Sequence, residues 1–175
     1  DKNFRPSYSF KAREIISMGR LPYKSFFARL NELDEKIILK SAEVLGISHL
    51  LERDITSLSD GERQLVFIAS SLAQDTECIL LDEPTNSLDP NKSARIFALL
   101  RNLVNSGKTI IAAVHDINLS LSYSDYYIAL REGELISFGK SNLLNEEVLK
   151  KLYNSEFIKY KNSERDDSMW RALPE

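Results

Sequence analysis

Cys78-Ile79-Leu80-Leu81-Asp82-Glu83-Pro84-Thr85 is the stretch that decides the fold of this chain. Four apolar residues run directly into two adjacent carboxylates, and a proline follows. A short apolar run bounded by turn residues is typical of a strand that is buried on both faces. Pro84 cannot donate a hydrogen bond to a neighbouring strand, so the strand is expected to end at the acids. Asp82 and Glu83 are therefore predicted to lie at the carboxyl edge of a sheet, where open α/β sheets bind ligands.

The two acids are expected to have different roles, because the pleat of a strand points neighbouring side chains to opposite faces. One carboxylate can hold a hard cation while the other faces a reacting water. The alternative is that both acids are solvated residues that simply follow a core strand. The motifs on either side of the strand favour a function.

Composition restricts the class of protein. The length of 175 residues fits one domain with a subdomain, and a hydrophobic fraction of 43% is enough for a core. A net charge of −3 argues against a nucleic-acid binder. The single cysteine, Cys78, forms no disulfide framework and is predicted to be an inert core residue. The chain opens on Asp1 rather than Met, from which we expect the back part of a larger protein.

The first 72 residues are predicted to be helical, because no strand pattern precedes residue 76. Ser9 is expected to cap a helix that ends at Gly19. Asp34 is expected to start a second helix, with apolar residues at helical spacing and a stop at Gly46.

A third helix is predicted after Leu58-Ser59-Asp60-Gly61-Glu62-Arg63-Gln64. Ser59 and Glu62 have the spacing of a capping box, which explains both residues without any ligand. A helix start with Ser and Gly also exposes N–H groups at the positive end of the helix dipole, which suits a phosphate. Both interpretations use the same geometry.

A second strand is predicted from Thr109 to Val114, after a helix that Asp89 caps and Pro90 begins. His115 follows this strand directly. If the two strands are parallel neighbours, His115 lies level with Glu83, and two strand ends that converge on one edge favour a function for the histidine.

The remainder of the chain is predicted to hold a hairpin and a final helix. Glu132-Gly133 has the chemistry of a tight turn between two strands. The expected elements are a short helix capped by Asp116, strands at Tyr126–Arg131 and Leu135–Phe138, and a helix at Leu143–Leu152. The last fifteen residues are charged, carry an isolated Trp170, and are uninformative about structure.

These motifs together resemble those of ATP-binding cassette (ABC) ATPases over roughly residues 7–155. Leu58-Ser59-Asp60-Gly61-Glu62 resembles the signature motif, and Cys78 to Glu83 resembles the Walker B strand with its catalytic glutamate. Ser87-Leu88-Asp89 resembles the D-loop, and His115 the switch histidine. The resemblance implies an α/β fold, namely part of a P-loop ABC ATPase core with a mostly parallel sheet and an all-helical subdomain.

The resemblance also implies a domain division and a set of partners. Residues 1–74 would be the helical subdomain with the signature motif, 75–140 part of the catalytic core, and 141–175 a C-terminal helix and tail. Transmembrane permease subunits and a second ATPase subunit in a head-to-tail dimer would be the partners, without nucleic acid. The protein would lie peripherally on the cytoplasmic face of the inner or plasma membrane.

The implied cofactors are ATP and Mg²⁺. By resemblance, Asp82 would hold Mg²⁺, Glu83 would polarise the attacking water, and His115 would contact the γ-phosphate and the water. Ser59, Asp60, Gly61 and Glu62 would form the signature segment that contacts the ATP of the second subunit, and Asp89 would lie at the dimer seam.

Two departures from the family pattern stand out. The usual signature has Gly where this chain has Asp60 and Gln where it has Glu62, and an acid near a phosphate weakens the attraction. No Gly-x-x-x-x-Gly-Lys-Ser/Thr loop occurs in the chain. The altered signature residues are expected to be tolerated, whereas the missing loop predicts that the chain alone does not hydrolyse ATP and binds it weakly.

The segments from Ala12 to Arg20 and from His115 to Leu119 resemble ATPases of importers for iron–siderophore, haem and cobalamin. The leading interpretation is the ATPase subunit of such an importer. The alternatives are an ABC ATPase that works on ribosomes or in DNA repair, which the acidic balance disfavours, and a non-catalytic docking remnant, which the missing loop favours for this chain alone.

A docking surface for the permease is predicted between Phe10 and Leu30. A three-helix subdomain cannot bury all the large apolar residues of this stretch, and a contiguous exposed apolar patch usually marks an interface. The residues are Phe10, Leu21, Tyr23, Phe26, Phe27 and Leu30.

Overall fold

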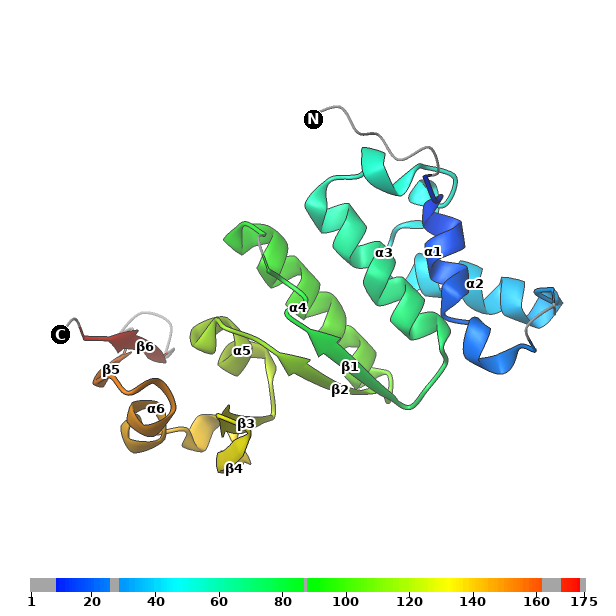
Figure 1. Ribbon diagram of the computed structural model, residues 1–175. Coiled ribbons are helices and arrows are strands. Elements are labelled where there is room, and N and C mark those ends of the chain that lie inside the picture. Colours follow the sequence, from blue (N-terminus) through cyan, green and yellow to red (C-terminus); the bar gives the residue numbers. More distant parts are fainter. Residues whose placement is uncertain (1–8, 26–28, 87, 162–167, 174–175) are drawn as a thin grey trace. The chain divides into compact units, whose positions relative to one another are not determined.

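The structure is a computed structural model of the chain, and it describes residues 9–25, 29–86, 88–161 and 168–173 (Figure 1). Phe26, Phe27 and Ser87, which the sequence singles out, lie outside the described residues. The chain forms two compact units, Asp1–Ala113 and Val114–Glu175. In the described part of the chain, no helix combines the length and the apolar character that a membrane crossing requires.

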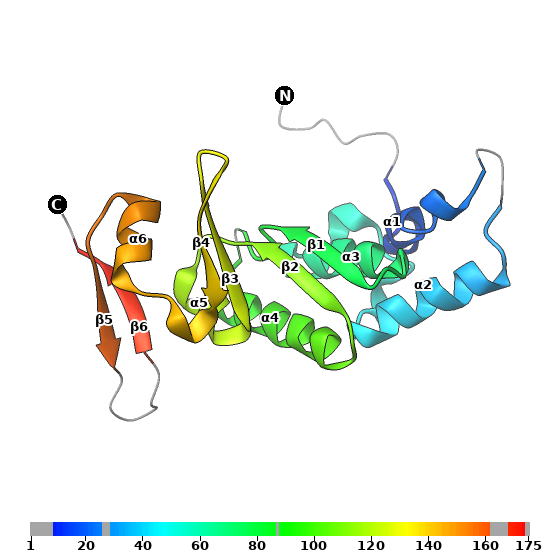
Figure 2. The ribbon, with the colours of Figure 1, turned by 90° about the horizontal axis from the view of Figure 1, so that it is seen from below.

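The first unit is mainly helical. Helices α1, α2 and α3 pack against one another, and α4 runs along a small sheet (Figures 1 and 2). Their bounds are α1 (Ala12–Met18), α2 (Glu32–Val44), α3 (Asp60–Ala73) and α4 (Pro90–Asn105), with short 3₁₀ turns η1 (Leu21–Tyr23), η2 (Ser48–Leu50) and η3 (Ile55–Ser57).

Helix starts follow the capping residues. Ser59 and Asp89 cap α3 and α4 as the sequence predicts, and Pro90 is the first residue of α4. Helix α2 begins earlier than predicted, because Asn31 is its N-cap and Asp34 is the third residue of a capping box. Helix α1 begins after Lys11 and not directly after Ser9, whose hydroxyl donates to Asp54 instead.

The core of the first unit lies between α1, α2, α3 and α4. Its largest fully buried side chains include Ile16, Ile38 and Ile68, one from each of the first three helices. Replacing a buried isoleucine with alanine typically lowers the free energy of unfolding by about 2–5 kcal/mol. Helices α1 and α3 approach closely at Gly19, where an added Cβ would lie 2.1 Å from the Ser70 carbonyl oxygen. This packing fixes the helix that carries the signature-like segment.

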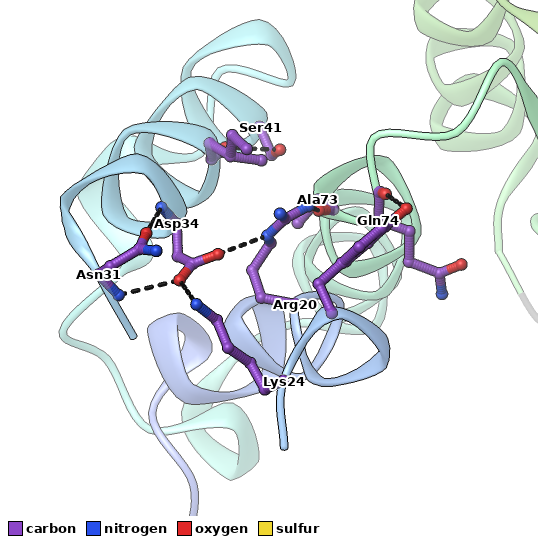
Figure 3. A network of polar contacts seen from close by, with 9 residues as sticks. Arg20, Lys24, Asn31, Asp34, Ser41, Ala73 and Gln74 are labelled. Carbon is purple, nitrogen blue, oxygen red and sulfur yellow. Dashed lines mark hydrogen bonds and ion pairs between the residues drawn. The ribbon is translucent and has the colours of Figure 1, made fainter. Parts of the chain in front are cut away.

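A buried polar network ties the turn after α1 to the start of α2 and the end of α3 (Figure 3). Arg20 Nε donates to Asp34 Oδ1 at 3.1 Å, and Arg20 Nη1 donates to the Ala73 carbonyl at 2.8 Å. Lys24 forms an ion pair with the same carboxylate, and the Asn31 backbone N–H donates to it at 2.9 Å. Asp34 is thus buried with all its charge compensated.

Strands β1 (Cys78–Asp82) and β2 (Thr109–Ala113) pair in parallel, with Cys78 opposite Thr109 and Asp82 opposite Ala113. The buried side of α4 packs on one face of this strand pair (Figure 2). The other face is open among the described residues, because Leu80 is 71% and Ile111 is 47% exposed. The prediction of strands buried on both faces is therefore wrong in this structure, and Cys78 is exposed rather than a core residue.

The second unit holds the remaining elements. These are α5 (Ile117–Tyr123), β3 (Tyr126–Arg131), β4 (Glu134–Lys140), the 3₁₀ turn η4 (Ser141–Leu143), α6 (Glu146–Tyr153), β5 (Phe157–Lys161) and β6 (Ser168–Ala172). The predicted hairpin is confirmed, since β3 and β4 pair antiparallel around Glu132 and Gly133, both with positive φ. Helix α6 begins three residues later than predicted, because Asn145 caps it.

The described part of the C-terminal segment forms a hairpin, about which the sequence was uninformative. Strands β5 and β6 pair antiparallel, and Trp170 is only 7% exposed. It packs in a cluster with Leu144, Leu149 and Phe157. The sequence pattern missed this hairpin because its apolar partners lie on α5, β3 and α6 and at Leu144, far from Trp170 in the chain.

Candidate functional site

The carboxyl end of β1 is the centre of the candidate site. Asp82 is the last residue of β1 and lies opposite Ala113, the last residue of β2. The carboxyl ends of both parallel strands therefore meet at one edge. Asp82 is exposed there and Glu83 is half-buried. The strand ends at the acids, as the proline predicts.

Glu83 adopts an uncommon backbone conformation. Its φ is 44°, in the left-handed region that glutamate rarely enters. Its N–H donates to the Ala113 carbonyl at 3.0 Å, and its carbonyl accepts from the Asn86 N–H at 3.0 Å. Glu83 lies outside the strand, so the pleat does not set the direction of its side chain. The expectation that strand alternation points Asp82 and Glu83 to opposite faces therefore does not apply. Backbone conformations of this kind cluster at functional sites, where the surrounding structure holds them.

His115 lies two residues beyond the end of β2 in the chain and is exposed. It belongs to the second unit and directly precedes Asp116, whose carboxylate accepts from the Leu119 N–H at 2.8 Å and so caps α5. The cap on α5 is confirmed. That His115 and Glu83 lie side by side at the carboxyl edge of the sheet stays a prediction.

The start of α3 forms the capping box that the spacing predicts. Glu62 Oε2 accepts from the Ser59 backbone N–H at 2.9 Å and from the Ser59 hydroxyl at 2.8 Å. The pKa of the Glu62 carboxyl is lowered from 4.5, mainly by the backbone N–H and then by the hydroxyl of Ser59. Glu62 is therefore an ionised carboxylate at neutral pH, turned back on Ser59.

The structure brings the start of α3 next to the start of α4. A Cβ added to Gly61 would lie 3.3 Å from Cδ of Lys92, so the lysine stem passes beside the first turn of α3. Lys92 Nζ pairs with Asp89 Oδ2 at 2.9 Å, and the Lys92 N–H donates to Asp89 Oδ1 at 3.0 Å. The pKa of Asp89 is lowered from 3.8, mainly by the Lys92 backbone N–H and then by its ammonium group.

Three basic residues near these segments were missed by sequence reasoning. Arg63 Nη1 lies 3.2 Å from Asp60 Oδ1, and Arg53 Nη1 lies 3.9 Å from Glu62 Oε1. Lys92 is the third. The i,i+3 spacing of Asp60 with Arg63, and of Asp89 with Lys92, is a helical pairing signal that could have found two of them.

The carboxyl edge of β1 fits a magnesium ion held mainly by a ligand rather than by a closed protein cage. Among the described residues, no group of three His, Cys, Asp or Glu side chains could hold a metal ion. Magnesium usually keeps several waters and takes one or two carboxylates plus substrate phosphates. The exposed carboxylate of Asp82 suits that arrangement.

Comparisons with known proteins agree with this fold. A family model described as "AAA domain, putative AbiEii toxin, Type IV TA system" matches residues 8–122. One solved structure matches this chain with a TM-score of 0.88 and 27% identity. The match covers 98% of this chain and 70% of that chain. That structure is titled "An inward-facing conformation of a putative metal-chelate type ABC transporter".

Curated relatives define the family more narrowly. The iron(3+)-hydroxamate import ATP-binding protein FhuC of Bacillus subtilis (strain 168) is 42% identical over 142 residues, which are 80% of this chain and 53% of that protein. The ferric enterobactin transport ATP-binding protein FepC of Escherichia coli (strain K12) is 36% identical over 143 residues, which are 81% of this chain and 53% of that protein. The chain thus spans about half the length of the curated relatives it matches.

Identity at this level over four-fifths of the chain, together with the fold and the order of its motifs, supports one conclusion. The chain belongs to the ATP-binding proteins of ABC transporters.

Proposed function

We propose that the protein to which this chain belongs is the ATP-hydrolysing subunit of an ABC importer for an iron–siderophore, haem or cobalamin-type chelate. The relatives are named for ATP-binding roles in the import of such chelates. The single observation that carries the catalytic part is the end of β1, where exposed Asp82 is followed by Glu83 in a left-handed conformation.

The geometry suits hydrolysis by positioning rather than by covalent chemistry. Phosphoryl transfer needs an oriented nucleophile and neutralised charge. The Glu83 carboxylate would accept a hydrogen bond from the attacking water, and His115 would contact that water and the γ-phosphate. Asp82 would hold Mg²⁺, which when bound neutralises charge on the phosphate oxygens.

The start of α3 would contact the nucleotide of a second subunit in a head-to-tail dimer. Its first turn carries the positive end of the helix dipole, which favours an anion. Ser59, Asp60, Gly61 and Glu62 would form this contact, and Asp89 would lie at the dimer seam.

The segment around η1 would dock on a permease and hold the protein peripherally at the membrane. Phe10 and Leu21 are 49% and 61% exposed, and Tyr23 and Leu30 are 54% and 36% exposed. Exposed large apolar side chains in one stretch of the chain support a protein interface there.

The decisive experiment changes Glu83→Gln in the full-length protein. The amide keeps the shape of the side chain but loses the charge that orients water, so kcat should fall about a hundredfold or more while ATP binding persists. Glu77→Gln is the matched control, because Glu77 is an exposed acid that directly precedes the first residue of the same strand. Steady-state hydrolysis and nucleotide binding give the readout.

Near wild-type turnover in Glu83→Gln would refute the catalytic assignment. A full-length protein that binds no ATP at all would instead favour the docking remnant. Hydrolysis that a permease never stimulates would favour an ABC ATPase outside transport.

A further inference from the structure

Lys92 links two segments that are separate in the sequence. It is the third residue of α4, and both its backbone N–H and its ammonium group contact the carboxylate of Asp89, at 3.0 and 2.9 Å. Its stem passes beside Gly61, where an added Cβ would lie 3.3 Å from Cδ and 3.9 Å from Cγ of the lysine. The Lys92 side chain thus contacts Asp89, the N-cap of α4, while its stem lies beside the first turn of α3.

The same region carries three carboxylates and three matching cations. Asp60 pairs with Arg63, Glu62 with Arg53, and Asp89 with Lys92. The pKa of Lys92 is raised from 10.5, first by its hydrogen bond to Asp89, then by the charge of Asp89, and also by the charge of Asp60. Lys92 therefore lies in the field of both segments and stays charged at neutral pH.

We propose that Lys92 is a positioning residue that holds Asp89, the N-cap of α4, beside the first turn of α3 and keeps a positive charge near that turn. The proposal rests on the proposed function, in which that turn contacts a nucleotide phosphate. A cation near that turn favours a phosphate there over distances of about a Debye length.

Gly61 permits this close approach of the Lys92 stem. It lacks the Cβ that would crowd the lysine stem, so the stem can lie close to the helix backbone. The stem and the charge of Lys92 can be separated by substitution. Lys92→Met keeps most of the stem and removes the charge, Lys92→Arg keeps the charge, and Lys92→Ala removes both.

The first test measures positioning without any nucleotide. Hydrogen–deuterium exchange of the Glu62 and Arg63 amides, whose N–H groups donate to the Ser59 hydroxyl and carbonyl, should be about threefold faster or more in Lys92→Ala in the full-length protein, because the turn loses its tether. Lys40→Met, at an exposed lysine of α2, is the control and should leave these amides unchanged. Unchanged exchange in Lys92→Ala would overturn the tether.

The second test measures the charge. Lys92→Met should raise the KM for Mg-ATP about fivefold at low salt with kcat within about twofold, and the effect should shrink at high salt. Lys92→Arg should restore the KM.

An unchanged KM in Lys92→Met would overturn the charge role, while hydrolysis by the wild type leaves the proposed function standing. A wild-type protein without Mg-ATP hydrolysis would refute the proposed function and the charge role together. In that case the exchange experiment still decides whether Lys92 tethers the two segments.

Discussion

At the scale of single residues, Asp34 shows how one acid can join three elements. Its carboxylate accepts from the Asn31 N–H and pairs with Lys24 and Arg20. The pKa of Asp34 is lowered from 3.8 to about 2, first by the Asn31 N–H, then by the Lys24 ammonium, while burial opposes the shift. The network fixes the end of α3 and the turn η1 with respect to α2.

This shift predicts an acid-dependent loss of stability. Because the folded-state pKa is below the unfolded-state value, the contribution is complete above pH 3.8 and disappears as the pH falls through about 2. Asp34→Asn should lower the urea midpoint at neutral pH and flatten its pH dependence across that window. Asp75→Asn is the control, because this exposed acid has a φ of 54° that asparagine also tolerates. Equal pH profiles for wild type and Asp34→Asn would contradict the prediction.

At the scale of elements, η1 presents the proposed docking residues, and the structure decides which of them to change. The Tyr23 hydroxyl donates to the Gln74 carbonyl at 2.6 Å, and its ring lies under the Arg20 guanidinium at 4.4 Å. Tyr23→Ala would therefore disturb the buried network as well as the surface. Leu21, 61% exposed, gives a cleaner test.

Leu21→Ser should weaken association of the full-length protein with its permease about tenfold or more, if this leucine anchors the interface. Leu33→Ser on α2 is a matched control, because Leu33 is also 61% exposed. Co-purification measures the association, and urea unfolding of the isolated subunit should change by no more than about 0.5 kcal/mol in either variant. Equal association of both variants would remove η1 from the docking surface.

The hairpin β5–β6 is tied to α5 by two hydrogen bonds. Asn118 Nδ2 donates to the Trp170 carbonyl at 2.9 Å, and the Trp170 N–H donates to Asn118 Oδ1 at 2.6 Å. Ile117 and Leu121 of α5 pack against the cluster that holds the Trp170 side chain. The hairpin is therefore part of the core of the second unit.

Trp170→Ala should destabilise the second unit by about 3–5 kcal/mol, since it removes a large buried side chain. Met169→Ala, at the neighbouring 56% exposed position, should stay within about 0.5 kcal/mol. Circular dichroism during urea unfolding measures both. A loss for Trp170→Ala no larger than that for Met169→Ala would show that the hairpin is dispensable.

At the scale of the whole molecule, nucleotide affinity is the property to measure. The 175 residues contain no Gly-x-x-x-x-Gly-Lys-Ser/Thr loop, whose backbone N–H groups and lysine supply most phosphate affinity. Calorimetric titration of this chain with Mg-ATP should therefore detect no micromolar binding. A micromolar dissociation constant would contradict this prediction.

The sequence by itself determined the local elements and the family. Helix caps at Ser59 and Asp89, the stop of β1 before Pro84, and the turn at Glu132 and Gly133 all depend on residues within a few positions of one another. Local patterns of this kind can be recognised directly in a sequence. The motifs that identify the family have the same local character.

Only the tertiary structure decided which faces are buried and which charges meet. The exposed face of β1, the burial of Trp170 and the approach of Lys92 to Gly61 each depend on residues that are distant in the chain. The left-handed conformation of Glu83 is fixed partly by the carbonyl of Ala113, thirty residues further along the sequence. No local pattern records such contacts, because burial and ion pairing are set by the packing of separate elements against one another.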